Sequence, residues 1–148
     1  MIRPFSLEDM NPVLKIEKAS FPKSPYNRIT FLHLHFLFPQ SFLVYAEKNA
    51  DGEEEVWGYI VFSPDGHIIS LAVLPQHRRK GVGRELLRKA MEMPNLKKLQ
   101  AEVRKSNLGA QAFYRRLGFR FMGIAPNYYG NEDALIIQWR PPAEMPPP

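Results

Sequence analysis

The segment between residues 76 and 84 combines basic side chains with two glycines and could bind an anion. It reads Gln76-His77-Arg78-Arg79-Lys80-Gly81-Val82-Gly83-Arg84. An apolar stretch typical of a strand, 67–74, leads into it, and the pattern of an amphipathic helix follows. Gly81 and Gly83 have no side chain, so the backbone can approach a ligand closely. The N–H groups at the start of the helix, together with the helix dipole, favour a phosphate there.

The spacing of the glycines separates this loop from two common nucleotide-binding motifs. No Gly-Lys-Ser/Thr follows, which excludes a Walker loop. Leu86 stands where a dinucleotide-binding fingerprint has its third glycine. A tight turn with glycines at a helix start is the alternative to a phosphate site.

Composition limits what other chemistry the chain can perform. It has no cysteine, which excludes a disulfide framework, a thiolate metal site and a cysteine nucleophile. It has only four histidines. Two of them, His33 and His35, lie two residues apart in a predicted helix and therefore point in different directions. We expect no metal.

Positive charge is concentrated in the middle of the chain. The net charge is +5, but residues 76–120 contain 13 Lys and Arg against three acids. A basic surface of this kind suggests an anionic partner, such as nucleic acid, the ribosome or a multiply phosphorylated cofactor. A solvated basic face is the alternative.

Hydrophobic periodicity and turn residues predict the elements that must position the loop. Ser6 can cap the first helix, and Gly118 can end the last one in a left-handed conformation. Strands are predicted at 1–3, 42–47, 56–62, 67–74, 98–103, 119–124 and 134–139, and helices at about 7–19, 28–37, 81–93 and 107–117. This order indicates an α/β domain with one mixed sheet and helices on both faces.

Length and end sequences predict a single domain in the cytoplasm. A chain of 148 residues fits one domain, which we place at 1–140. Residues 141–148 contain five prolines and are expected to form a disordered tail. No apolar stretch reaches the ~18 residues of a membrane span, and the N-terminus lacks a signal-peptide pattern. We therefore expect no membrane association.

Three segments together resemble the GNAT acetyltransferases. Arg78-x-x-Gly81-x-Gly83 is similar to the acetyl-CoA pyrophosphate loop of that superfamily. Residues 102–107 (Glu-Val-Arg-Lys-Ser-Asn) and 112–119 (Ala-Phe-Tyr-Arg-Arg-Leu-Gly-Phe) resemble its second half-site. Tyr128-Tyr129 followed by Glu132-Asp133-Ala134 resembles the RimI/Ard branch, which acetylates the N-terminal α-amino group of proteins.

The resemblance implies a fold and a mode of cofactor binding. The fold would be a mostly antiparallel seven-stranded sheet, splayed in the middle, with four flanking helices. Strand residues Leu71, Ala72 and Val73 would lie beside the pantetheine arm of acetyl-CoA, with the backbone of Leu71 and Val73 bonding it. The pyrophosphate would be bound by Arg78 and by the N–H groups of the run Arg79, Lys80, Gly81, Val82, Gly83 and Arg84.

The resemblance also assigns roles in catalysis. Glu102 would be the general base, and Tyr114 would be the general acid as well as a cofactor contact. Asn107 would cap the helix that follows it, bond the cofactor, or do both. The alternatives are an ion pair of Glu102 with Arg104 or a neighbour, and a half-buried packing role for Tyr114.

The acceptor is the least defined partner. By position, Tyr128 and Tyr129 could bond a peptide backbone, and Phe21 and Tyr26 could line the pocket for its first side chain; packing is the alternative for each. The segment 22–28 departs from the RimI pattern. At pH 7 an α-amine with a pKa near 8 is about 10% neutral, whereas a lysine is about 0.04% neutral, which favours an N-terminal acceptor.

The sequence therefore predicts transfer of an acetyl group from acetyl-CoA to the N-terminal α-amino group of a protein or peptide. Two alternatives stay open: a GNAT enzyme that acetylates a lysine or a small amine, and a basic module that binds RNA or the ribosome. Ribosome proximity fits the charge of 76–120, but no specific nucleic acid is expected.

Overall fold

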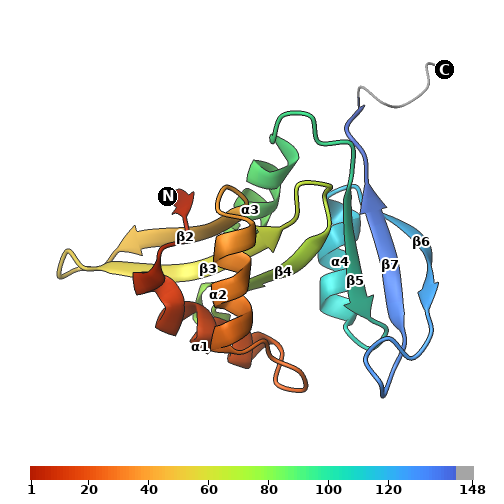
Figure 1. Ribbon diagram of the computed structural model, residues 1–148, viewed down its shortest axis with the longest axis horizontal. Helices are drawn as coiled ribbons and strands as arrows, with labels where there is room; N and C mark the ends of the chain where they lie inside the picture. The colour runs from red at the N-terminus through yellow and green to blue at the C-terminus, as the bar shows by residue number, and fades with distance from the viewer. Residues whose placement is uncertain (143–148) are drawn as a thin grey trace. The chain divides into compact units, whose positions relative to one another are not determined.

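The computed structural model describes residues 1–142, which form two compact units (Figure 1). The first unit contains Met1–Pro64 and Ile69–Glu92. The second contains Asp65–Ile68 and the chain from Met93 onward. Most of the tail predicted to be disordered, 143–148, lies outside the described residues. The domain limits of 1–140 stay a prediction.

A four-stranded sheet forms the centre of the first unit, in the order β1-β2-β3-β4. Its strands are β1 (Ile2–Pro4), β2 (Phe42–Lys48), β3 (Glu54–Phe62) and β4 (Ile68–Val73). β2 pairs antiparallel with both β1 and β3. All four strands were predicted, and their ends differ from the prediction by one or two residues.

Helices cover both faces of this sheet (Figure 1). They are α1 (Met10–Ser20), α2 (Arg28–Leu37) and α3 (Val82–Met91). On β3, Tyr59 packs its ring against Phe31 of α2, with the centroids 5.6 Å apart. A Cβ atom on the preceding Gly58 would instead meet Val82 of α3 at 3.1 Å. Adjacent strand residues point to opposite faces, so α2 and α3 lie on opposite sides of the sheet.

The first helix begins later than predicted. We expected a helix over about 7–19, but Leu7–Asp9 is a 3₁₀ turn and α1 starts at Met10. Asp9 explains the difference. Its carboxylate accepts the backbone N–H of Ser6 at 2.8 Å and pairs with Arg3 at 2.8 Å. These bonds close a tight turn before the α-helix can begin.

The second unit contains a three-stranded antiparallel sheet in the order β5-β7-β6. The strands are β5 (Leu99–Arg104), β6 (Arg120–Ala125) and β7 (Ala134–Trp139), and α4 (Leu108–Arg116) lies on one face (Figure 1). Within residues 1–142 the seven predicted strands and four predicted α-helices are confirmed. The single continuous sheet is wrong, because β4 and β5 each end a sheet of their own. Local patterns identify strands but not which strand edges pair.

A glycine turn places His67 beside β5. Gln100 N donates to Gly66 O at 2.8 Å, and His67 forms an isolated parallel bridge with Gln100. Gly66 has a φ of +93°, and a Cβ atom there would lie 1.8 Å from the backbone oxygen of Lys98. Only glycine fits this contact, so the position of His67 depends on it.

This close approach can be tested with two alanine substitutions. Gly52 also has a positive φ, +79°, but a Cβ atom there would meet nothing within 4 Å. Gly52→Ala should lower the free energy of unfolding by about 1 kcal/mol, which is the cost of a left-handed conformation for alanine. Gly66→Ala adds a clash with the backbone and should lower it by about 3 kcal/mol or more. Urea denaturation measures both, and equal losses would contradict the structure.

Candidate active site

The glycine loop of the first unit has the backbone geometry of an anion site. The chain turns through two left-handed residues, Arg79 (φ 64°) and Gly81 (φ 85°). The first bond of α3 runs from Glu85 N to Gly81 O at 3.0 Å. The N–H groups of Val82, Gly83 and Arg84 therefore precede the first helical bond, as at every helix start. A Cβ atom on Gly81 would meet nothing within 4 Å, so the chain itself does not block a ligand there.

The guanidinium of Arg78 bonds other parts of the first unit. Its Nε donates to Val73 O at 3.0 Å, and its Nη2 donates to Ser20 Oγ at 3.1 Å. These bonds connect the start of the loop to the ends of β4 and α1. A direct contact between the Arg78 guanidinium and a phosphate stays a prediction.

An aromatic cluster that we did not predict as part of the site supports the other end of the loop. The ring of His77 stacks on Trp57 with the centroids 3.9 Å apart and the planes 6° from parallel. Lys80 Nζ lies 3.3 Å from His77 Nδ1 and 5.3 Å from the centre of the Trp57 ring. Burial, followed by the charge of Lys80, lowers the pKa of His77. This stack reduces the freedom of the loop before any ligand binds.

The outer edge of β4 presents the backbone groups predicted for the pantetheine arm. Leu74 N donates to Trp57 O at 2.8 Å, so Leu74 and Ala72 direct their backbone groups toward β3. Leu71 and Val73 alternate with them and direct theirs to the opposite edge. β4 is the last strand of its sheet. The backbone geometry thus supports Leu71 and Val73, and a cofactor contact of the buried Ala72 stays a prediction.

In the second unit, Glu102 of β5 is held through one of its two carboxylate oxygens. Oε1 lies 2.6 Å from His67 Nε2 and accepts the Tyr128 hydroxyl at 3.1 Å. Oε2 is buried and has no hydrogen-bond partner among the described residues. The carboxylate is therefore fixed in orientation through Oε1.

The electrostatics of this pair keep Glu102 ionised. Burial by itself would raise the pKa of Glu102, but the hydrogen bond and charge of His67, with the hydrogen bond from Tyr128, lower it overall. The hydrogen bond to Glu102 in turn raises the pKa of His67, although burial opposes this. We did not predict His67 as a site residue. Its place at the start of a strand gave no signal of a partner 35 residues away.

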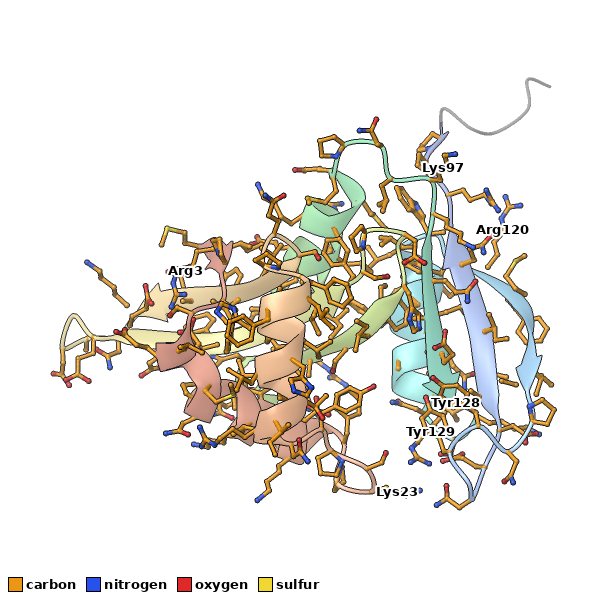
Figure 2. The ribbon with its side chains drawn as sticks, in the orientation of Figure 1. Arg3, Lys23, Lys97, Arg120, Tyr128 and Tyr129 are labelled. Carbon is orange, nitrogen blue, oxygen red and sulfur yellow. The ribbon has the colours of Figure 1, made fainter. Side chains whose placement is uncertain are left out.

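The tyrosine pair belongs to the same cluster. Figure 2 shows Tyr128 and Tyr129 beside one another in the segment between β6 and β7. Tyr129 donates its hydroxyl to the backbone oxygen of Glu102 at 3.2 Å. Arg104 lies over the Tyr129 ring at 4.1 Å and pairs with Glu132 at 2.9 Å. The ion-pair alternative for Glu102 is thus met by His67, at 2.6 Å, while Arg104 pairs with Glu132.

Tyr114 of α4 is more buried than the half-buried alternative assumed. It is 8% exposed, and its ring packs edge-on against Phe119 at 5.0 Å. Burial, followed by the charges of Tyr129 and Glu102, raises the pKa of Tyr114. Its hydroxyl is thus protonated at neutral pH. Asn107 caps α4, since its Oδ1 accepts Ala110 N at 3.1 Å, so the capping prediction is confirmed.

The predicted acceptor residues of the first unit lie around the loop between α1 and α2. Phe21 ends α1 and packs, partly buried, on the hydrophobic core. Tyr26 is 40% exposed, and its ring contacts Phe31 edge-on at 6.0 Å. Its backbone N–H donates to Glu17 Oε2 at 2.9 Å. Glu17, on the first predicted helix, is a buried carboxylate that no local sequence pattern singles out.

Two absences hold for residues 1–142. No group of three or more His, Asp or Glu side chains is placed to hold a metal ion. No helix in this range is long and apolar enough to cross a membrane. The predicted independence from metal is not tested by either observation.

Comparison with known proteins decides the family. The sequence profile of the acetyltransferase (GNAT) family matches residues 9–119. The chain belongs to the GNAT acetyltransferase family. An N-alpha-acetyltransferase of Sulfurisphaera tokodaii is 32% identical, with 92% of this chain and 90% of the relative covered. The predicted GNAT resemblance, acetyltransferase class and fold are confirmed.

Two solved structures support both halves of the predicted RimI/Ard resemblance. Ard1 from Thermoplasma volcanium has a TM-score of 0.83 at 32% identity, covering 95% of this GNAT chain and 96% of that one. The ribosomal-protein-S18-alanine N-acetyltransferase from Escherichia coli has a TM-score of 0.76 at 26% identity, covering 95% and 92%. Both similarities extend over nearly the whole chain.

The ion pair of the second unit predicts a titration that NMR can follow. His67 should titrate above 6.5, and Glu102→Gln should return its pKa toward 6.5, because the carboxylate that favours the imidazolium is gone. His77 is an internal control, since it belongs to the other unit and should stay below 6.5 in both proteins. A His67 pKa that does not move would contradict the pairing.

The same pair predicts how stability changes with pH. The raised pKa of His67 stabilises the fold fully below its unfolded value of 6.5, and this is lost as pH rises through the folded value. The lowered pKa of Glu102 stabilises fully above 4.5, and this is lost as pH falls through the folded value. The stability difference between wild type and Glu102→Gln should therefore be largest between pH 4.5 and 6.5.

Proposed function

We propose that this chain transfers the acetyl group of acetyl-CoA to the N-terminal α-amino group of a protein or peptide. The observation that carries the proposal is Glu102, a carboxylate that is kept ionised and is oriented through Oε1 by His67 and Tyr128. Membership of the GNAT family supplies the reaction class. The names of the relatives, an N-alpha-acetyltransferase and a ribosomal-protein alanine N-acetyltransferase, support the acceptor.

The first unit fits acetyl-CoA, which supplies an acetyl group activated as a thioester. The backbone N–H groups of Val82, Gly83 and Arg84 precede the first bond of α3, beside a glycine whose Cβ would meet nothing within 4 Å. The positive end of α3 and the basic side chains favour a diphosphate at this point. At the edge of β4, an added strand could bond the backbone of Leu71 and the N–H of Val73, while Val73 O already accepts from Arg78. We assign cofactor binding to these residues.

The second unit supplies the groups for proton transfer. The Glu102 carboxylate takes a proton from the acceptor amine, directly or through a water, as the amine nitrogen bonds to the acetyl carbon, the carbon–sulfur bond breaks and coenzyme A leaves as the thiolate. His67 then acts as a positioning residue, and its partly exposed ring connects the carboxylate to solvent.

Tyr114 provides a hydrogen bond to the leaving sulfur. A thiol has a pKa near 8.5, and burial raises the pKa of Tyr114 above its usual value of 10. Full transfer of the Tyr114 proton to the thiolate is therefore uphill. The hydroxyl stabilises the developing negative charge chiefly by donating a hydrogen bond, so its effect should be smaller than that of Glu102.

The ease of deprotonation favours an α-amine as acceptor. Because hydrogen bonds lower the pKa of Glu102, it is a modest base, and at neutral pH an α-amine is about 250-fold more often neutral than a lysine. The hydroxyls of Tyr128 and Tyr129 donate to Glu102, which supports the assignment of these two tyrosines to the acceptor peptide next to the reacting amine. Cytoplasmic location and proximity to the ribosome stay predictions.

Substitution of the two proton-handling residues tests the assignment. Glu102→Gln should lower kcat about 100-fold or more, since general base catalysis contributes at least that much, and Tyr114→Phe about 10-fold. Acetyl-CoA should still raise the melting temperature of both variants. Steady-state kinetics with a peptide acceptor measure the rates, with Glu92→Gln, an exposed carboxylate, as the matched control. An unchanged kcat in both variants would contradict the roles assigned to Glu102 and Tyr114.

A further inference from the structure

A buried carboxylate in the first unit has no part in the chemistry described so far. Glu17 of α1 is 1% exposed. An ionisable side chain is rarely buried this completely unless hydrogen bonds compensate for the lost hydration. Its surroundings therefore indicate what it does.

Two side-chain hydroxyls and one backbone N–H donate to this carboxylate. Tyr59 of β3 donates its hydroxyl to Oε1, and Ser70 of β4 donates its own at 3.1 Å. The two hydroxyl oxygens lie 2.9 Å apart, but each has a single hydrogen, and donation to Glu17 leaves none for a bond between them. Burial and the charge of Glu17 raise the pKa of Tyr59, which keeps its hydroxyl protonated as a donor.

The other oxygen bonds a backbone group outside the sheet. Oε2 accepts the N–H of Tyr26 at 2.9 Å. Tyr26 lies in the segment between α1 and α2, where residues 22–27 belong to neither helix and are exposed. A bond from an exposed segment to a buried anion is stronger than one between neutral groups. Glu17 thus attaches this segment to the core of the first unit.

We propose that Glu17 is a positioning residue for the acceptor. By fixing Tyr26, it holds the segment whose residues Phe21 and Tyr26 receive the first side chain of the acceptor peptide. The inference rests on the proposed function, because it concerns the acceptor of that same reaction. It gives a physical reason for a buried charge that core packing alone does not need.

The two oxygens of Glu17 allow the role to be separated from stability. Glu17→Gln keeps the shape but replaces the charged acceptor of the Tyr26 N–H by a neutral amide, which accepts a weaker hydrogen bond. Tyr59→Phe and Ser70→Ala remove donors to Oε1 and leave the bond from Tyr26 to a charged Oε2. All three variants disturb the same buried network, but only Glu17→Gln weakens the bond that holds Tyr26.

Kinetics with an N-terminal peptide should show this difference. Glu17→Gln should raise the KM for the peptide 10-fold or more, with kcat and the Kd for acetyl-CoA changed less than 3-fold. Tyr59→Phe and Ser70→Ala should each change the peptide KM less than 3-fold. Should the KM of all three rise in proportion to their loss of melting temperature, Glu17 is only structural and the proposal is wrong.

The proposal can also be tested if the variants do not fold. Hydrogen exchange of wild type should show a protected Tyr26 amide within an exposed segment, with more protection when the peptide binds. An amide that exchanges at the unprotected rate would overturn the proposal. The activity of wild type tests the proposed function separately, and no acetylation of any free N-terminus would refute it. The ratio of variant to wild-type KM tests only the role of Glu17.

Discussion

The hydrogen bond between His67 Nε2 and Glu102 Oε1, at 2.6 Å, determines how the second unit can do chemistry. It fixes the carboxylate in one orientation and keeps it ionised despite burial. The bond exists because the turn at Gly66 brings the start of β4 against β5 within this unit. The orientation of Glu102, the candidate base, thus depends on the backbone conformation of Gly66, which only glycine can adopt at this contact.

The candidate anion site of the first unit is built by different means. It consists chiefly of backbone N–H groups, which carry only partial charges. Two basic side chains of the loop stabilise its structure. Arg78 bonds the ends of β4 and α1, and Lys80 contacts His77 and Trp57. Glu17, the fully buried carboxylate, holds an exposed segment in place. The charged side chains Arg78, Lys80 and Glu17 therefore hold the loops of this unit in position.

A feature could be predicted from the sequence when the residues that determine it lie close together in the chain. The glycine loop, the Asn107 cap and the seven strands depend on residues close together in the chain, and each was predicted from local pattern. The pairing of His67 with Glu102, the burial of Glu17 and the stack of His77 on Trp57 join residues from 20 to more than 50 positions apart. No periodicity or motif contains that information. The split into two sheets was missed for the same reason, since strand patterns do not identify their partners.

The central claim is that this GNAT chain acetylates an α-amino group, and the mass of a peptide product tests it most directly. Two peptides of identical sequence, each with one internal lysine, are incubated with acetyl-CoA and the full chain; one has a free N-terminus and the other a blocked one. The account predicts one added acetyl group, located at the N-terminus, on the free peptide and none on the blocked peptide. Acetylation of lysine on the blocked peptide at a comparable rate would contradict it.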